Sequence, residues 1–382
     1  MDAASSVSSR PLVDVRLEDL STRTGQLPYL TNVSVHIRYG EFFTFLGPAQ
    51  SGKTAVLRAI AGFLPLSGGR VRVDDEDVGH LPPGRRGMGY VFHLGALWPH
   101  LTVYEHVEFG LRQRALPAAD VGRRARLVTR RLGLADVVDR RPDELALHQK
   151  RRLALARALA VEPRVLLLDE PLAHLDPMPR KALRLELARL HRDLAVTTVC
   201  ATRDAADALA LSDRIAVMEG GRVLQVGDPE ELYRRPVARA VAEALGPANF
   251  VPVQVVEVRD LGVVVETEGG ARLPVAGVGA FRQGSRGVLV LRPETLALVE
   301  SAEARGPGIP GKVAFRVFEG SRYLYEIDIR GSVAVRVELP AIETAIFRLG
   351  DQVRVEVSSD TVVLLPAEAA SAAPASAAGY SS

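Results

Sequence analysis

The chain has 382 residues, 47% hydrophobic and 25% charged, which is an ordinary globular composition and predicts two or three domains. Its net charge of +2 gives no electrostatic reason to expect a nucleic acid partner, and a single cysteine excludes an internal disulfide. The sequence contains no run of about 18 uninterrupted apolar residues, so it predicts no membrane-spanning helix. Residues 1–11 and 367–382 have compositions typical of disordered tails.

The spacing of apolar residues predicts alternating strands and helices in the first two thirds of the chain. This alternation implies an α/β domain with a doubly wound parallel sheet, in which ligands bind at the carboxyl ends of the strands. The predicted elements, in chain order, are strands over 12–20, 33–37 and 41–46, a helix over 55–62, strands over 71–73 and 89–92, a helical region over 101–160, a strand over 165–168, a helix over 178–194, a strand over 195–201, a helix over 204–211 and strands over 214–218 and 222–226.

The composition changes near Gly246-Pro247, where glycine-rich turns begin to separate short alternating strands. This pattern predicts an antiparallel all-β domain, a small barrel or two. The sequence therefore divides into an α/β domain over 12–245, with a helical subdomain at about 95–160, and an all-β domain over 247–366. The predicted strands of the second domain are 252–258, 262–266, 286–291, 312–318, 322–329, 333–339, 352–356 and 361–365.

The segment between the strand over 41–46 and the helix over 55–62 carries the strongest motif. It reads Gly47-Pro48-Ala49-Gln50-Ser51-Gly52-Lys53-Thr54 and fits the phosphate-loop pattern G-x-x-x-x-G-K-[ST]. Strand, glycine loop and helix is the context that the pattern requires, because backbone N–H groups at a helix N-terminus favour an anion. Lys53 is expected to reach the outer phosphates of a nucleotide, and the Thr54 hydroxyl to bind Mg²⁺.

A second part of a nucleotide site follows about 115 residues later, where the apolar strand over 165–168 ends in Asp169-Glu170. With the phosphate loop, this is the two-part site of a P-loop ATPase. Four further stretches, 91–111, 143–159, 166–176 and 200–218, resemble the ATP-binding subunit of ABC transporters. Residues 247–365, with Leu291-Arg292-Pro293-Glu294, resemble the oligobinding-type, TOBE-like regulatory domain of importer subunits. The spermidine/putrescine, ferric iron and aminoethylphosphonate group is the most similar, and the maltose group is more distant.

The resemblance implies an ABC-type ATPase that dimerises around two ATP molecules and drives solute uptake through transmembrane permease subunits, together with a solute-binding protein. It implies a peripheral location at the cytoplasmic face of the cell membrane, with membrane contact only through these partners and no nucleic acid. The matching residues assign Asp169 to Mg²⁺ and Glu170 to polarising the attacking water, and they place Asp176 in a loop that communicates across the dimer.

Several positions that the resemblance assigns to nucleotide binding and hydrolysis depart from the family pattern. These departures predict slow or partner-dependent hydrolysis. Arg203 stands where a histidine contacts the γ-phosphate, and it could compensate in part by supplying transition-state charge. The alternative is a non-hydrolysing, nucleotide-binding scaffold that pairs with an intact partner. Among the other departures, Gln50 stands where the phosphate loop usually has a glycine, and His93 stands where a glutamine contacts Mg²⁺. Thr24 takes the place of the aromatic residue that stacks on adenine, and Tyr29 is either its substitute or a packing tyrosine. In the signature loop, Ala146-Leu147-His148 replace the serine and the two glycines that precede Gln149.

Overall fold

The computed structural model describes residues 13–24, 27–93, 95–114, 116–276, 281–300, 307–329, 333–342 and 346–367. The two tails predicted at 1–11 and 367–382 lie outside these residues, apart from Ala367. Contacts divide the chain into two units between Pro229 and Glu230. This division precedes the composition change at 246–247, because the buried Arg292 guanidinium donates to the carbonyl oxygens of Ala242, Gly246 and Pro247 and so joins this segment to the second unit.

A six-stranded sheet forms the centre of the first unit, with the order β10-β9-β3-β8-β7-β6. The five strands from β9 to β6 are parallel to their neighbours, and only the edge strand β10 runs antiparallel, through its hairpin with β9. The predicted parallel α/β sheet is therefore confirmed. The strands are β3 (Phe42–Leu46), β6 (Met88–Val91), β7 (Val165–Asp169), β8 (Thr197–Thr202), β9 (Arg214–Glu219) and β10 (Arg222–Gly227).

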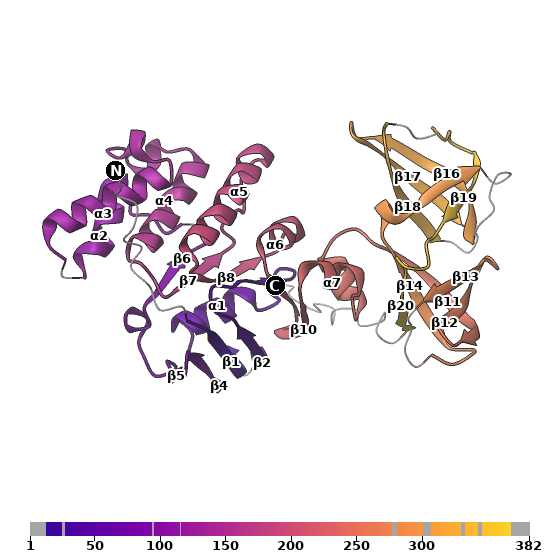
Figure 1. Cartoon of the computed structure of the whole chain (residues 1–382), viewed down its shortest axis with the longest axis horizontal. Coiled ribbons are helices and arrows are strands. Elements are labelled where there is room, and N and C mark those ends of the chain that lie inside the picture. Colours follow the sequence, from indigo (N-terminus) through magenta and orange to yellow (C-terminus); the bar gives the residue numbers. More distant parts are fainter. Residues whose placement is uncertain are drawn as a thin grey trace, which may run out of the picture. The chain divides into compact units, whose positions relative to one another are not determined.

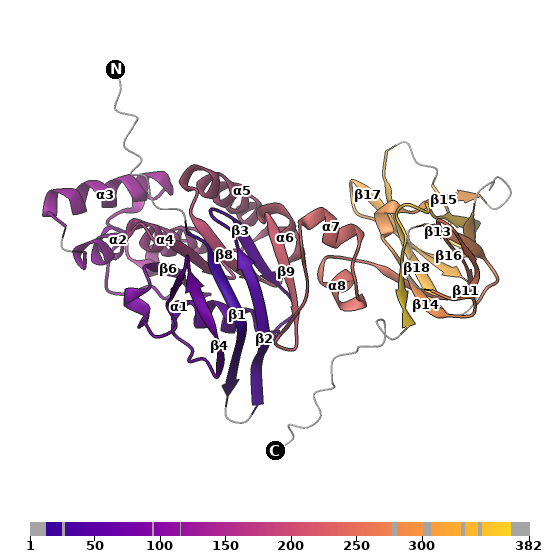
Figure 2. The same cartoon turned by 60° about the horizontal axis from the view of Figure 1, so that its bottom comes forward.

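A second, antiparallel sheet of order β2-β1-β4-β5 covers helix α1 (Lys53–Ala61), so that α1 lies between the two sheets (Figures 1 and 2). Phe43 and Phe45 of β3 project into this layer, where they join Val56 and Ile60 of the helix. Sequence periodicity predicted three of these strands but not that they form a sheet of their own. Their bounds are β1 (Val15–Thr24), β2 (Leu27–Ile37), β4 (Gly68–Val73) and β5 (Glu76–Asp77).

The opposite face of the six-stranded sheet is covered by helices, because alternate residues of the same strands, such as Phe42 and Leu168, point that way. The described residues of the helical region predicted over 101–160 form three α-helices, with two short 3-10 helices between the last two, and they gather at one end of this unit (Figure 1). Pro117 precedes α3, since proline cannot continue a helix, and Gly133, at φ +62°, follows the end of α3. The helices are α2 (Val103–Arg112), α3 (Ala118–Arg131), α4 (Leu147–Ala160), α5 (Pro177–Leu194) and α6 (Ala205–Leu211).

The second unit contains two five-stranded antiparallel sheets that share one apolar core, as the predicted all-β domain requires. Two edge strands escaped prediction: β13 contains Pro274, which argues against a strand in sequence, and β15 has only four residues. The orders are β13-β12-β11-β14-β20 and β15-β19-β16-β17-β18. The elements are α7 (Pro229–Arg234), α8 (Arg239–Ala244), β11 (Asn249–Arg259), β12 (Gly262–Thr267), β13 (Arg272–Ala276), β14 (Arg286–Leu291), β15 (Ala297–Glu300), β16 (Gly308–Phe318), β17 (Arg322–Ile329), β18 (Val333–Pro340), β19 (Gln352–Glu356) and β20 (Val363–Pro366). In the part of the chain described, no helix is long and apolar enough to cross a membrane.

Candidate functional site

The phosphate loop lies at the carboxyl end of β3 and turns directly into α1, as its sequence predicts. Gly52 caps the helix at φ +100°, a backbone conformation that side chains disfavour. At Gly47 a Cβ would lie 2.2 Å from the Met218 carbonyl oxygen, so only glycine fits there. Lys53 Nζ donates to the Pro48 carbonyl oxygen (2.6 Å) and to Ser51 Oγ (3.1 Å), so the loop closes around the ammonium group.

Lys53 is 5% exposed, and its burial changes its acid–base behaviour. Burial lowers the pKa of Lys53 to about 8, an effect that the nearby Glu170 and Asp169 carboxylates oppose and the Arg203 guanidinium reinforces. A desolvated ammonium group gains more from a new anionic neighbour than one in water does, because the local dielectric constant is lower. The loop therefore holds a positive charge that an oxyanion would stabilise.

Asp169, at the end of β7, meets the loop through Thr54. The Thr54 hydroxyl donates to Asp169 Oδ1 at 2.8 Å, which brings together two residues that are far apart in sequence. Hydroxyl and carboxylate oxygens are hard ligands that suit Mg²⁺. No group of three His, Cys, Asp or Glu side chains in the described ranges could hold a metal ion.

Tyr90 is a site residue that sequence reasoning missed. Its hydroxyl donates to Asp169 Oδ2 at 3.2 Å. Burial is the main cause that raises the pKa of Tyr90 far above its ordinary value, and the Asp169 charge adds to it, so the phenol keeps its proton. The segment over 89–92 was predicted only as a strand. The available signal was a lone hydroxyl near the carboxyl end of a strand in a parallel sheet, the edge at which ligands bind.

Glu170 and Arg203 form an ion pair, with Arg203 Nε 2.9 Å from Glu170 Oε1. Glu170 has φ +48°, and its N–H donates to the Ala201 carbonyl oxygen of β8 at 2.8 Å. Positive φ at a non-glycine residue costs energy and is concentrated at functional sites. The predicted catalytic carboxylate therefore has a fixed backbone and a side chain that is already paired with a cation.

One cavity of about 180 Å³ is lined by part of the predicted loop and by Glu170 and Arg203, which follow strands β7 and β8, whereas Asp169 is not among its lining residues. Tyr29, which is 45% exposed, lies at this cavity, whereas the Thr24 side chain is outside the described residues. Lys53 and Thr54 connect the cavity to Pro48, Ser51 and Asp169 through the hydrogen bonds given above. The lining residues are Tyr29, Ala49, Gln50, Gly52, Lys53, Thr54, Glu170 and Arg203.

Gln50 has φ +63°, the conformation in which a side chain is strained. We expect Gln50→Gly to raise the free energy of unfolding by about 1 kcal/mol, because glycine adopts this conformation without steric cost. Urea denaturation of the purified protein measures the change. Ala49→Gly is the matched control: Ala49 has no positive φ, so glycine there only adds entropy to the unfolded chain and lowers stability. Equal losses in the two variants would contradict the strain at Gln50.

His93 and Gln149 do not line this cavity. The His93 ring packs edge-on against His174, with centroids 5.3 Å apart, and its backbone carbonyl accepts from Arg151. Gln149 Oε1 accepts from the Ala146 N–H at 3.0 Å, so this side chain satisfies the start of its own helix, α4. Neither residue contacts the phosphate loop of its own chain in the contacts described. Any role for Gln149 at a phosphate would therefore be toward a second subunit.

His106 holds the segment that follows His93. His106 Nδ1 donates to the Thr102 carbonyl oxygen (2.7 Å), and Nε2 accepts from the Trp98 N–H (2.9 Å), which requires a neutral ring. Burial lowers the pKa of His106. Below about pH 6.5 the folded protein therefore binds fewer protons than the unfolded chain does. The contribution of His106 to the free energy of unfolding is fully present above that pH and is lost as the pH decreases below it.

We therefore expect the wild-type protein to lose about 1 kcal/mol of unfolding free energy when the pH falls below about 6, because protonated His106 cannot accept from Trp98. Urea midpoints across this range measure the loss. His106→Gln should reduce the dependence to the part that comes from His191, whose pKa burial also lowers, whereas replacing the exposed His80 by glutamine should leave it unchanged. A His106→Gln variant with the full wild-type slope would show that another group is responsible.

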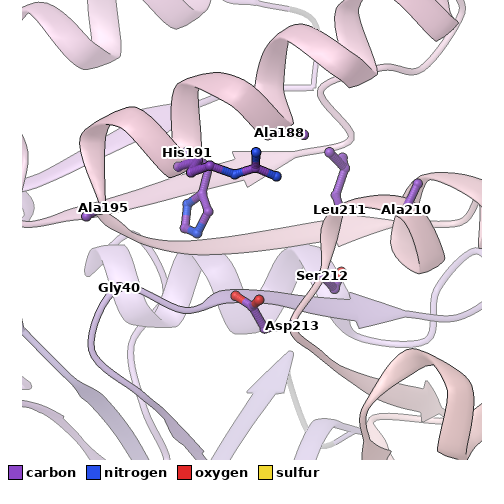
Figure 3. Close-up of a pocket in the computed structure, with 9 residues that line it drawn as sticks. Gly40, Ala188, His191, Ala195, Ala210, Leu211, Ser212 and Asp213 are labelled. Atoms are coloured by element: carbon purple, nitrogen blue, oxygen red, sulfur yellow. The ribbon is translucent and has the colours of Figure 1, made fainter.

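A larger cavity, of about 420 Å³, lies at the opposite edge of the sheet, where β3 and β9 begin. Figure 3 shows the His191 imidazole and the Asp213 carboxylate pointing toward this space. His191 packs edge-on against Phe42 (5.2 Å), and burial lowers the pKa of its imidazole, which Asp213 opposes. Ligands of parallel sheets bind at the carboxyl ends of the strands, so this cavity at the amino ends is not where the nucleotide chemistry is expected.

Comparison with known proteins agrees with this geometry. Residues 30–173 match the family model "ABC transporter", and residues 289–365 match the TOBE domain. The maltose/maltodextrin import ATP-binding protein MalK of Photorhabdus laumondii is 35% identical over 92% of this chain and 93% of its own length. The spermidine/putrescine import ATP-binding protein PotA of Rubrobacter xylanophilus is 40% identical over 82% of this chain and 83% of its own length.

Solved structures show the same relationship for part of the chain. The protein cbiO1 of Clostridium perfringens, part of the ABC transporter complex cbiONQ, is 30% identical with a TM-score of 0.54 and covers 58% of this chain and 90% of its own. An ATP-binding cassette solved as a post-hydrolysis dimer with ADP and Pi is 28% identical with a TM-score of 0.52, covering 56% of this chain and 98% of its own. This chain therefore belongs to the ABC transporter family, as an ATP-binding protein with an ABC ATPase domain followed by a TOBE domain.

Proposed function

We propose that this chain is the energy-coupling subunit of an importer and that the cavity at its phosphate loop binds MgATP. The observation that carries the proposal is the 2.8 Å contact between Thr54 Oγ1 and Asp169 Oδ1, with Lys53 on the same cavity. These are the groups that a P-loop ATPase uses for metal and phosphate. The family relatives named above are import ATP-binding proteins, which supports uptake as the process served.

The residues divide the work in the proposed reaction, which is attack of water on the γ-phosphate. Lys53 and the loop N–H groups would neutralise the outer phosphates, and Thr54 and Asp169 would hold Mg²⁺. Bound Mg²⁺ would neutralise charge that develops on the phosphate oxygens. Glu170 would orient and polarise the water once its carboxylate is free of Arg203, whose guanidinium could then meet the γ-phosphate.

Two subunits are proposed to enclose two ATP molecules, each held between one phosphate loop and the other subunit's signature loop. In this chain Ala146, Leu147 and His148 precede Gln149 in the signature loop. The loop therefore lacks the serine hydroxyl and the two glycines of the family pattern. Loss of one charge-stabilising donor can lower the rate roughly 10²–10³-fold. We infer that hydrolysis by the isolated protein is slow, and that Leu147, which is exposed, occupies space close to the partner's phosphate.

The proposed setting is the cytoplasmic face of the cell membrane, reached through transmembrane permease subunits that work with a solute-binding protein. The named relatives serve different solutes, maltose/maltodextrin in one case and spermidine/putrescine in another, so membership of the family does not select the solute. We propose that the permease and the solute-binding protein determine selectivity.

The test is calorimetric binding of MgATP to the purified full-length protein, followed by its rate of phosphate release. We expect measurable binding and slow release, and we expect Ala146→Ser, Leu147→Gly and His148→Gly combined to raise the rate about 100-fold. The control is Lys150→Ala, a change on helix α4 just after these three positions, which should leave the rate low. Binding without turnover in both forms would favour the non-hydrolysing scaffold, and no binding at all would overturn the nucleotide site.

A further inference from the structure

We propose that Tyr90 is a positioning residue of the nucleotide site, whose hydroxyl orients the Asp169 carboxylate for the divalent cation. The inference rests on the proposed function, because it concerns the Mg²⁺ that Thr54 and Asp169 would hold. Nothing in the phosphate-loop pattern or in the Asp-Glu strand ending assigns a role to this tyrosine. It is the contact geometry of the folded chain that singles it out.

The Asp169 carboxylate is held from two sides. Oδ1 accepts from the Thr54 hydroxyl at 2.8 Å and Oδ2 accepts from the Tyr90 hydroxyl at 3.2 Å, while the residue as a whole is only 3% exposed. Rotation of the carboxylate would break one or both bonds and leave a charged oxygen without a partner in a buried position, which is costly. The two hydroxyl groups therefore set the plane of the carboxylate before any ligand arrives.

The ring of Tyr90 is itself fixed, so its hydroxyl is a rigid donor. Tyr90 lies on the edge strand β6 and pairs with Leu167 of β7, two residues before Asp169. Its ring centroid is 4.4 Å from that of Phe92 and 5.6 Å from that of Phe63. Phenylalanine at position 90 would keep these strand and ring contacts, so that Tyr90→Phe removes the hydroxyl alone.

The consequence is specific to the metal. Without the Tyr90 hydroxyl, the Asp169 carboxylate keeps the Thr54 hydroxyl as its hydrogen-bond donor among the described residues, and a pre-set metal ligand becomes a mobile one. Partners that orient a metal ligand from behind commonly contribute 10- to 100-fold to metal affinity. The Lys53 ammonium group is positioned by hydrogen bonds to Pro48 and Ser51, so its interaction with phosphate does not depend on Tyr90.

The experiment compares ATP binding to the full-length protein in excess Mg²⁺ and in excess chelator, by titration calorimetry. The ratio of the two affinities measures how much Mg²⁺ strengthens ATP binding. We expect Tyr90→Phe to bind metal-free ATP as tightly as the wild type does. Its ratio of ATP affinities with and without Mg²⁺ should be about tenfold smaller than that of the wild type. The matched control is Tyr104→Phe, which removes a hydroxyl from α2 in the helical subdomain and should leave both affinities unchanged.

A second comparison separates orientation from a general structural effect. In an Asp169→Asn background, Tyr90→Phe should cause no further loss of Mg²⁺ enhancement, since the two residues act as one unit. Full enhancement in Tyr90→Phe would overturn the role of Tyr90 while leaving the proposed function intact. Equal weakening of metal-free and Mg²⁺-bound ATP would also overturn it, because that pattern indicates a structural role. Failure of the wild type to bind ATP would instead reject the proposed function.

Discussion

Replacing Lys53 by alanine is expected to weaken MgATP binding by about 100-fold or more, because the change removes the positive charge enclosed by the loop. Lys53 is buried, and its ammonium group donates hydrogen bonds to the Pro48 carbonyl and Ser51 hydroxyl oxygens. A methyl group cannot stabilise a phosphate oxygen in that position. Calorimetric titration of the variant with MgATP measures the loss directly.

The control for this prediction is Lys312→Ala, which removes the same charge from an exposed position in the second unit. Its MgATP affinity should equal that of the wild type, which excludes a general effect of net charge. Thermal unfolding of Lys53→Ala should show a folded protein, because removing a desolvated charge relieves a cost in the ligand-free state. Undiminished MgATP binding by folded Lys53→Ala would place the nucleotide elsewhere.

Replacing Glu170 by glutamine is expected to lower whatever rate of ATP hydrolysis the protein has by roughly 100-fold or more, while MgATP binding persists. The amide keeps the size of the side chain but cannot polarise the attacking water as a carboxylate does. Single-turnover phosphate release measures the rate, and calorimetry measures binding. Because the starting rate is itself predicted to be slow, the protein with Ala146→Ser, Leu147→Gly and His148→Gly is the more sensitive background.

The Arg203 ion pair adds a second readout to the Glu170 substitution. Glutamine cannot keep the charge interaction that holds Arg203 Nε at 2.9 Å, so the guanidinium becomes free to meet a phosphate. MgATP affinity should therefore stay the same or rise. The control is Glu186→Gln on α5, which breaks an ion pair with Arg152 outside the cavity and should change neither binding nor rate. Equal rates in Glu170→Gln and the parent protein would remove Glu170 from the proposed reaction.

Much of the fold was accessible from sequence because its signals are local. In the phosphate loop, Gly52 adopts φ +100°, a requirement of its own turn, and the buried strand before Asp169 is an uninterrupted apolar run. The same holds for the change to short alternating strands that marks the all-β domain. Prediction failed where local signals are weak, as for the proline-containing β13 and the four-residue β15, which only their neighbours in the sheet stabilise.

The sequence by itself determined that this chain carries a phosphate loop, an Asp169-Glu170 strand ending and a second, β-rich domain, since each depends on residue types within a few positions of one another. The tertiary structure alone decided that Tyr90 donates to Asp169 and that Arg203 pairs with Glu170. These contacts exist because parallel strands β6, β7 and β8 are neighbours in the sheet and end at the same edge. Strand order depends on packing across the whole domain, so no local pattern encodes which side chains will meet there.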